Sequence, residues 1–173
     1  MRSKNKYRVN PSNVKDVSVR FNSVKKLINV YGSVLDAGGE NDFAKALGIK
    51  SFIVSDLNYP FTTSYKYDLV TSFEVIEHLQ NPLIYLESIK SCLKNNGQLC
   101  LTTPVRWIFK GKYHFHEFNE LELLDILNMA GFRVIKMTRI PAYNLKHLGI
   151  RPVIRKIRDL IKGQCFYVVT EKY

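Results

Sequence analysis

The stretch "VLDAGGENDFAKALG", residues 34–48, predicts a strand, a tight turn and a helix in direct succession. The apolar run ends in Asp36, and Gly38 and Gly39 then permit a sharp turn. A glycine turn between a strand and a helix brings backbone N–H groups close to a ligand at the carboxyl end of the strand. We therefore interpret this stretch as the loop that holds a nucleotide-like ligand.

Strand-like and helix-like segments alternate along the rest of the chain. Buried strands are expected at 33–38, 51–56, 67–73, 98–105, 132–140 and 165–172. Helices are expected across 17–31, from Asn41 to Gly48, from Asn81-Pro82 to Asn95-Asn96-Gly97, from Asn119 with its capping-box partner Glu122 to Gly131, and across 152–162. The alternation predicts an α/β fold with a mostly parallel sheet covered on both sides.

The composition fits a single domain of 173 residues. We divide it into a basic N-terminal segment and helix (1–32), a core (33–141), and a basic amphipathic helix with the last strand (142–173). The sequence has no run of about 18 apolar residues, as a membrane span needs, and no secretion signal is recognised. Three cysteines without C-x-x-C spacing indicate reduced thiols in the cytoplasm.

The net charge of +11 is concentrated at the two ends of the chain. Residues 1–30 carry +7 and residues 145–173 carry +5, whereas residues 31–144 carry −1. Such ends attract RNA, an anionic membrane surface or an acidic substrate, or they serve only solubility. The apolar stripe of 152–162 fits docking on the core, and its basic face fits peripheral contact with a membrane.

Four segments together resemble one known family. They are "VLDAGG" (34–39), "YDLVTSFEVIEHLQNP" (67–82), "LKNNGQLCLTTPV" (93–105) and "HFHEFNELELLDILNMAGFRVI" (114–135). In this order they are similar to the motifs of class I S-adenosylmethionine-dependent methyltransferases of the small-molecule type, over roughly residues 30–140. The resemblance implies a Rossmann-like, doubly wound sheet of about six strands with an antiparallel last strand. It also implies S-adenosyl-L-methionine as the cofactor.

The resemblance assigns cofactor-binding roles to residues at the carboxyl ends of the strands. Asp36 would bind the cofactor's ammonium group or, alternatively, the N–H groups of its own turn. Asp56 would accept both ribose hydroxyls or, alternatively, cap a turn. Phe73 or Leu57 would offer an apolar face to the adenine. The full set of expected cofactor-binding residues is Asp36, Gly38, Gly39, Glu40, Asp56, Leu57, Ser72, Phe73 and Glu74.

Two features depart from the family pattern. Glu40 and Asp42 stand where the family spaces its second and third glycines, so the loop is degenerate unless Gly39 takes the second glycine's part. Only the eleven residues 57–67 separate Asp56 from Asp68, too few for the usual helix and strand. We expect the usual edge strand to be missing, with residues 59–61 rebuilding one wall of the adenine pocket. The alternative is that the second strand is lost and Asp56 lies near adenine.

Methyl transfer to a neutral oxygen or nitrogen also requires a group that takes the acceptor's proton. His78, Glu77 and His114 are the expected catalytic residues, with His116 and Glu117 as further candidates. Bracing or capping roles are the alternatives for the histidines. No metal is expected, because the His-x-His spacing of 114–116 has no further ligand cluster beside it in the sequence. Trp107 would stack on the acceptor or anchor its loop.

The segment that follows the third expected strand bears on the acceptor class. Enzymes of this fold that methylate nucleobase amino groups commonly carry Asn/Asp-Pro-Pro-Tyr/Phe there, whereas this chain has "SFEVIEHL" (72–79). We expect a small-molecule, glycan or lipid-type acceptor. The alternatives are an inactive methyltransferase-like binding or regulatory module and an RNA-directed methyltransferase. A nicotinamide-dependent oxidoreductase is disfavoured because "GGENDF" (38–43) is not G-x-G-x-x-G.

Overall fold

The computed structural model describes residues 14–39, 42–106, 113–141 and 165–173, with side chains from residue 19 onward. Four sequence predictions therefore lie outside the described residues: Asn41 as a helix cap, Glu40 as a cofactor residue, Trp107 in the acceptor loop, and the helix 152–162.

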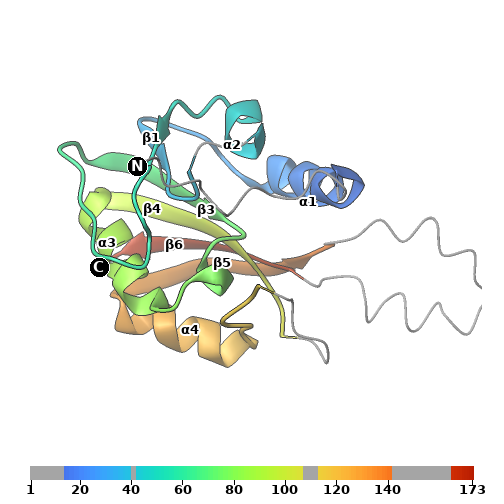
Figure 1. Ribbon diagram of the computed structural model, residues 1–173. Coiled ribbons are helices and arrows are strands. Elements are labelled where there is room, and N and C mark those ends of the chain that lie inside the picture. Colours follow the sequence, from blue (N-terminus) through green and yellow to red (C-terminus); the bar gives the residue numbers. More distant parts are fainter. Residues whose placement is uncertain (1–13, 40–41, 107–112, 142–164) are drawn as a thin grey trace, which may run out of the picture.

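The described part of the chain forms one six-stranded sheet in the order β2-β1-β3-β4-β6-β5 (Figure 1). The strands are β1 (Val34–Asp36), β2 (Ser51–Phe52), β3 (Tyr67–Phe73), β4 (Leu93–Pro104), β5 (Phe132–Ile140) and β6 (Cys165–Lys172). The pairs among β1, β2, β3 and β4 are parallel, and β6 is antiparallel to both β4 and β5. The predicted α/β fold with an antiparallel last strand is confirmed.

Residues alternate between two cores on opposite faces of the sheet. On β3, Val70 belongs to the larger core and its neighbour Leu69 to the smaller one. On β4, Leu99 belongs to the larger core and its neighbour Cys100 to the smaller one. This alternation is the period of two that a strand buried on both faces requires. The larger core packs under α3 (Pro82–Cys92) and α4 (Glu120–Met129), and α1 (Val14–Leu27) contributes Val24 to the smaller core. Figure 1 shows α3 and α4 on the side of the sheet opposite α1 and α2 (Asp42–Ala46).

The helix caps follow the sequence signals. The Asn81 side chain accepts a hydrogen bond from the Ile84 N–H at 3.3 Å, and Pro82 opens α3. Asn119 and Glu122 form the predicted capping box of α4, and Gly131 follows that helix with φ +78°. These caps fix where α3 and α4 begin, and with them the loops that precede both helices at the carboxyl edge of the sheet.

Several predicted boundaries are wrong. The helix expected across 17–31 is α1, which ends at Leu27, and the strand expected at 33–38 is the three-residue β1. The strand expected at 51–56 is only the two-residue β2, and the Val54 side chain is 89% exposed, so the apolar run leaves the sheet after Phe52. The helix expected to end at Asn95-Asn96-Gly97 ends at Cys92, and β4 starts at once. The register jumps there, from Leu93 opposite Tyr67 to Gln98 opposite Leu69. The Asn-Asn-Gly signal therefore marks a bulge within the strand.

The missing edge strand is confirmed. β2 pairs with β1 and lies at the edge of the sheet, and residues 53–66, all of them described, contain no strand. Asp56 therefore follows the second strand, as the ribose interpretation requires.

Candidate functional site at the carboxyl edge of the sheet

Asp36, at the end of β1, is fully buried and binds the turn that follows it. Its Oδ1 accepts a hydrogen bond from the Gly38 N–H at 2.9 Å, and its Oδ2 accepts one from the Thr71 hydroxyl at 2.7 Å. Gly39 has φ +82°, a conformation that side chains rarely adopt, so this position favours glycine. The structure thus gives Asp36 the turn-bonding role that was the alternative to a direct contact with the cofactor.

Asp56 is exposed at the same edge and caps a short turn. Its Oδ1 accepts hydrogen bonds from the main-chain N–H and from the side-chain amide of Asn58, both at 3.0 Å. Leu57 packs against the larger core, and Phe61 is buried with its ring 6.0 Å from that of Tyr85. Tyr59 is 67% exposed. The Phe61 ring therefore belongs to the core, and the expectation that residues 59–61 rebuild a wall of the adenine pocket stays a prediction.

Two of the pocket residues expected on β3 are engaged by other side chains. The Ser72 hydroxyl is buried and lies 2.7 Å from the Tyr85 hydroxyl, which in turn donates to the Ala37 carbonyl at 3.4 Å. Burial raises the pKa of Tyr85 well above its usual range. The Phe73 ring lies edge-on to Phe43 of α2 with 4.8 Å between centroids. Ser72 thus braces the glycine turn, and Phe73 extends the apolar contact under α1 and α2.

Glu74 is held in place by three segments of the chain. Its φ is +56°, and no other non-glycine residue among the described residues has a positive φ. Its Oε1 accepts hydrogen bonds from the Thr102 hydroxyl at 2.9 Å and the Cys165 thiol at 3.0 Å. Its Oε2 pairs with Arg20 of α1. Strained backbone of this kind persists where surrounding contacts hold it, and it is typical of functional sites.

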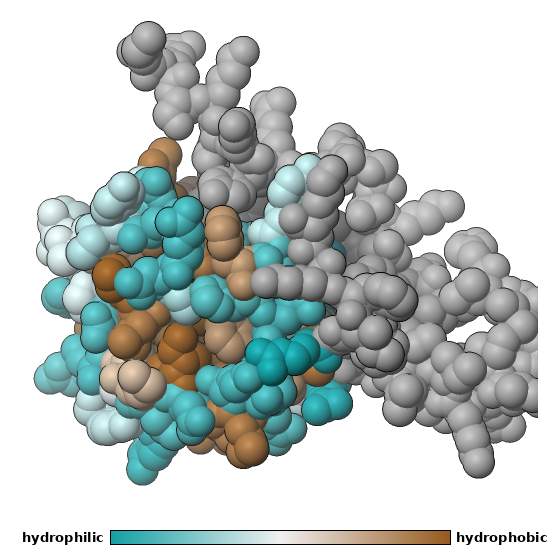
Figure 2. All heavy atoms as spheres, turned by 60° about the horizontal axis from the view of Figure 1, so that its bottom comes forward, coloured by the Kyte–Doolittle hydropathy of each residue, from teal (hydrophilic) through white to brown (hydrophobic). Residues whose placement is uncertain are grey.

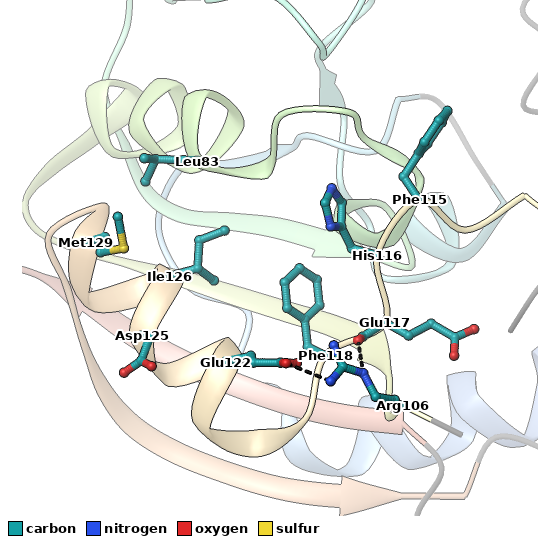
Figure 3. Close-up of a pocket in the computed structure, with 10 residues that line it drawn as sticks. All are labelled: Leu83, Arg106, Phe115, His116, Glu117, Phe118, Glu122, Asp125, Ile126 and Met129. Carbon is teal, nitrogen blue, oxygen red and sulfur yellow. Dashed lines mark hydrogen bonds and ion pairs between the residues drawn. The ribbon is translucent and has the colours of Figure 1, made fainter. Parts of the chain in front are cut away.

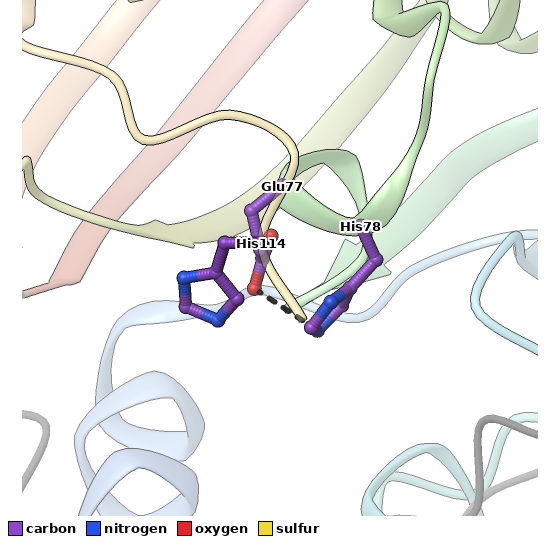
Figure 4. A group of neighbouring side chains, drawn as sticks. All are labelled: Glu77, His78 and His114. Atoms are coloured by element: carbon purple, nitrogen blue, oxygen red, sulfur yellow. Dashed lines mark ion pairs between the residues drawn. The ribbon is translucent and has the colours of Figure 1, made fainter. Parts of the chain in front are cut away.

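The three residues predicted to be catalytic meet at this edge, although 36 positions of sequence separate His114 from His78. One ligand atom from each of Glu77, His78 and His114 lies within 4.8 Å of the other two (Figure 4). The two imidazole rings are in edge contact at 5.0 Å between centroids, and His78 Nε2 lies 3.8 Å from Glu77 Oε1. Glu77 and His78 come from the short 3-10 helix η2 (Ile76–His78) after β3.

Main-chain hydrogen bonds bring His114 to the other two residues. The Glu77 carbonyl accepts hydrogen bonds from the N–H groups of Phe115 at 2.8 Å and His116 at 3.1 Å. The His114 Nδ1 atom lies 2.8 Å from Glu117 Oε1, and the His78 Nδ1 atom lies 3.0 Å from the Tyr113 carbonyl oxygen. The segment 113–118 is thus fastened to η2 at several points. The two histidines therefore brace this loop, as the alternative interpretation expected, and also lie in one cluster with Glu77.

Glu77 is a buried carboxylate whose charge is poorly compensated. It is fully buried, and its Oε2 accepts a hydrogen bond from the Thr103 hydroxyl at 3.1 Å. Its Oε1 accepts none. Burial, and next the negative charge of Glu74, raise the pKa of Glu77 well above its usual range. Arg20 acts in the opposite direction but less strongly.

A groove of about 640 Å³ lies behind this segment, between α3 and α4. Its lining residues are Leu83, Arg106, Phe115, His116, Glu117, Phe118, Glu122, Asp125, Ile126 and Met129 (Figure 3). Apolar side chains gather on this face of the molecule in Figure 2. His116 stacks on Phe118 here, 5.9 Å between ring centroids, instead of joining His114. None of the expected cofactor-binding residues lines this groove.

Sequence reasoning missed several partners of these residues. Thr71, Thr102 and Thr103 could have been found from strand adjacency, because they end β3 and β4 at the same edge. No sequence pattern indicated that Arg20 pairs with Glu74, because the two residues are 54 positions apart. Among the described residues, no helix is long and apolar enough to cross a membrane.

The sheet order and its covering helices define a Rossmann-like α/β protein, and comparison with known proteins identifies the family. A family model described as "Methyltransferase domain" matches residues 7–137, so the chain belongs to this methyltransferase family. A protein of Mycolicibacterium smegmatis named "Probable S-adenosylmethionine-dependent methyltransferase" is 32% identical over 74 residues. That match spans 39% of this chain and 29% of the relative, so less than a third of the relative's length is covered.

Solved structures confirm the fold. The SAM-dependent methyltransferase of Thermotoga maritima superposes with a TM-score of 0.69 at 17% identity, covering 92% of this chain and 90% of that one. The 1,6-didemethyltoxoflavin-N1-methyltransferase of Burkholderia thailandensis, solved with its substrate and S-adenosylhomocysteine, gives 0.62 at 14% identity over 93% and 80% of the two chains.

Proposed function

We propose that the protein transfers a methyl group from S-adenosyl-L-methionine to a small-molecule acceptor. One observation carries the proposal: the polar residues that follow successive strands lie at one edge of the sheet. They are the glycine turn after β1, Asp56 after β2, and the cluster of Glu77 and His78 after β3 with His114 after β4. In parallel α/β sheets that edge is where ligands bind. The family membership supports the reaction type.

The residues present fit this cofactor. Gly38 and Gly39 carry no side chain that would keep the amino-acid end away from the main chain, although the Gly38 N–H already donates to Asp36. Glu40, which lies outside the described residues, belongs to the same proposed set. The exposed Asp56 accepts both of its described hydrogen bonds at Oδ1, and a carboxylate has about four acceptor sites. The remaining capacity fits the ribose hydroxyls. Leu57, Ser72, Phe73 and Glu74 complete the proposed set of cofactor-binding residues.

The bound cofactor supplies an electrophilic methyl group on a positively charged sulfur. The protein's part is to hold the acceptor in line with that carbon, to exclude water, and to receive the acceptor's proton. Glu77, His78 and His114 are the groups we assign to the acceptor's proton. Phe21 of α1 extends the aromatic contacts of Phe43 and Phe73 in an apolar row beside β3.

The acceptor class follows from sequence and from the fold neighbours. The Burkholderia enzyme, with the same fold, is solved with a small molecule beside the cofactor product. A glycan or lipid-type acceptor is the finer form of the proposal, and the basic ends would serve contact with an anionic membrane or with RNA. Cytoplasmic localisation belongs to the same proposal.

A second candidate is a methyltransferase-like binding module without catalysis. It is favoured by the self-contained hydrogen bonds of Asp36 and by the pairing of Arg20 with Glu74, which brings α1 across the edge.

Calorimetric titration of the full chain with S-adenosylhomocysteine separates the two candidates. We expect one site, weakened at least about tenfold by Asp56→Asn, because the ribose hydroxyls lose a charged acceptor. Asp125→Asn, at an exposed position on α4, is the matched control and should bind like the unaltered protein. No binding at millimolar ligand, or equal binding by both variants, contradicts the proposed cofactor site.

A further inference from the structure

We propose that Glu77, His78 and His114 bind a divalent first-row transition-metal cation of the zinc type. The three residues offer one carboxylate oxygen and two imidazole nitrogens within 4.8 Å of one another. Two histidines and one carboxylate form a recurrent ligand set that leaves further coordination positions open. The binding itself is independent of the proposed function, whereas the role assigned to the cation below rests on it.

The partners of the two rings favour the tautomer that a metal requires. The Tyr113 carbonyl oxygen can only accept a hydrogen bond, so His78 Nδ1, 3.0 Å away, carries the proton in the neutral ring. Glu117 Oε1 selects the same tautomer of His114 at 2.8 Å. In both rings the lone pair is then on Nε2. Metal-binding histidines characteristically donate Nδ1–H to a carbonyl or carboxylate in this way.

The carboxylate supplies the second, independent observation. Glu77 is fully buried, and its Oε1 is one of two buried side-chain oxygens among the described residues that accept no hydrogen bond. Figure 4 shows this carboxylate directed between the two imidazole rings. Buried carboxylates are normally paired or bound to a metal, because an uncompensated buried charge is costly. A cation at this point would satisfy the orphan oxygen and offset the repulsion from Glu74.

The donor set also selects the class of ion. Imidazole nitrogens suit zinc, iron, copper and nickel, whereas magnesium and calcium prefer oxygen ligands. Ligand bonds to zinc are about 2.0–2.2 Å long, so the three atoms must approach one another slightly when the ion binds. The hydrogen bonds from Phe115 and His116 to the Glu77 carbonyl hold the two segments together, so the approach is made by the side chains.

This inference differs from the expectation drawn from the sequence, which considered a metal only at the His-x-His spacing. The fold separates those two histidines, since His116 turns to Phe118, and joins His114 to Glu77 and His78 instead. In the proposed reaction, an acceptor oxygen that occupies an open coordination position loses its proton more readily. With the cation bound, the three side chains act as its ligands in place of the proton-accepting role assigned above, and the proton passes to solvent. The acceptor oxygen bonds to the methyl carbon, and the carbon–sulfur bond electrons remain on sulfur.

Titration of the full chain with Co²⁺ alone, without cofactor or acceptor, tests the site by visible absorption. We expect one equivalent to bind with visible d–d bands, which Zn²⁺ abolishes by competition. His114→Ala and His78→Ala should each weaken binding by more than tenfold, and Glu117→Gln should weaken it by about 10–100-fold through the Nδ1 contact. His116→Ala is the matched control and should bind normally.

The absence of a Co²⁺ spectrum overturns the proposal, and so does equal binding of Co²⁺ by His114→Ala and His116→Ala. A thiolate charge-transfer band near the ultraviolet would assign the ion to cysteine, and would also overturn it. Circular dichroism of each variant shows whether it is folded. If a histidine variant does not fold, the Co²⁺ affinity of Glu117→Gln still tests the site. Loss of S-adenosylhomocysteine binding with intact Co²⁺ binding would refute the proposed function and leave the metal site standing.

Discussion

Two buried acids at the same edge of the sheet have opposite surroundings. Asp36 has both carboxylate oxygens occupied, one by the Gly38 N–H and the other by the Thr71 hydroxyl. Glu77 is equally buried, but one oxygen accepts no hydrogen bond and a second acid, Glu74, raises its pKa further. A satisfied buried acid stabilises the fold, whereas an unsatisfied one destabilises it and is retained for another reason. From this difference we infer that Asp36 maintains the structure of the site, whereas Glu77 takes part in its chemistry.

The largest expected effect is at Asp36. Asp36→Ala removes two charge-assisted hydrogen bonds and leaves a buried hydroxyl and the turn N–H without their acceptor. We expect the free energy of unfolding to fall by about 3 kcal/mol. Urea denaturation followed by circular dichroism measures it. A decrease in the free energy of unfolding of less than about 1 kcal/mol would contradict the claim that Asp36, unlike Glu77, stabilises the fold.

Glu77→Gln should act in the opposite direction. The amide is nearly isosteric and uncharged, so the uncompensated charge disappears, and we expect unfolding to cost about 1 kcal/mol more than in the unaltered protein. Methyl-transfer activity and Co²⁺ binding should both fall. The same urea experiment applies, and a variant that is less stable by several kcal/mol would show that the carboxylate is needed for folding.

The pairing of Arg20 with Glu74 should affect ligand exchange more than stability. Both side chains are about a quarter exposed, so screening limits the stabilisation lost in Arg20→Ala to about 0.5–1 kcal/mol. Release of α1 from the edge should speed both association and dissociation of S-adenosylhomocysteine in stopped-flow measurements. Lys25→Ala, on the same helix, is the control. Identical rates in the two variants would mean that α1 does not cover the crevice.

The smallest effect is expected away from the edge, at Asp68. Hydrogen bonds from Lys94 and from Ser33 lower the pKa of this carboxylate below its usual range. A pKa lowered by folding means that its stabilisation is present above the unfolded value, about 3.9, and is lost as pH falls below it. Asp68→Asn should therefore lower Tm slightly at pH 7. The difference should shrink below about pH 4, and a constant difference would contradict the assignment.

The sequence predicted the elements that have strong local signals. β3, β5 and β6 begin and end where the apolar runs do, and the caps at Asn81 and Asn119 form as expected. The short β2 could not be anticipated, because an apolar run does not reveal where a strand loses its partner. The bulge in β4 imitates a helix end, because bulges and turns favour the same residues.

The site was predictable in part, for a physical reason. Residues at strand ends share an edge in any parallel sheet, which is why Glu77 and His78 were found. Their hydrogen-bond partners, such as Glu117 for His114 and Arg20 for Glu74, depend on how loops and helices return to that edge. Whether an acid binds its own turn or a ligand was open for Asp36 and Asp56, since both uses need the same residue in the same place.

A crystal structure of the full chain grown with S-adenosylhomocysteine tests the central claim most directly. The account predicts the ribose hydroxyls on Asp56 and the amino-acid end against the main chain of Gly38 and Gly39, with Glu77, His78 and His114 facing the sulfur. A crevice without ligand density at millimolar concentration, closed by Arg20 and Phe21 of α1, would contradict it.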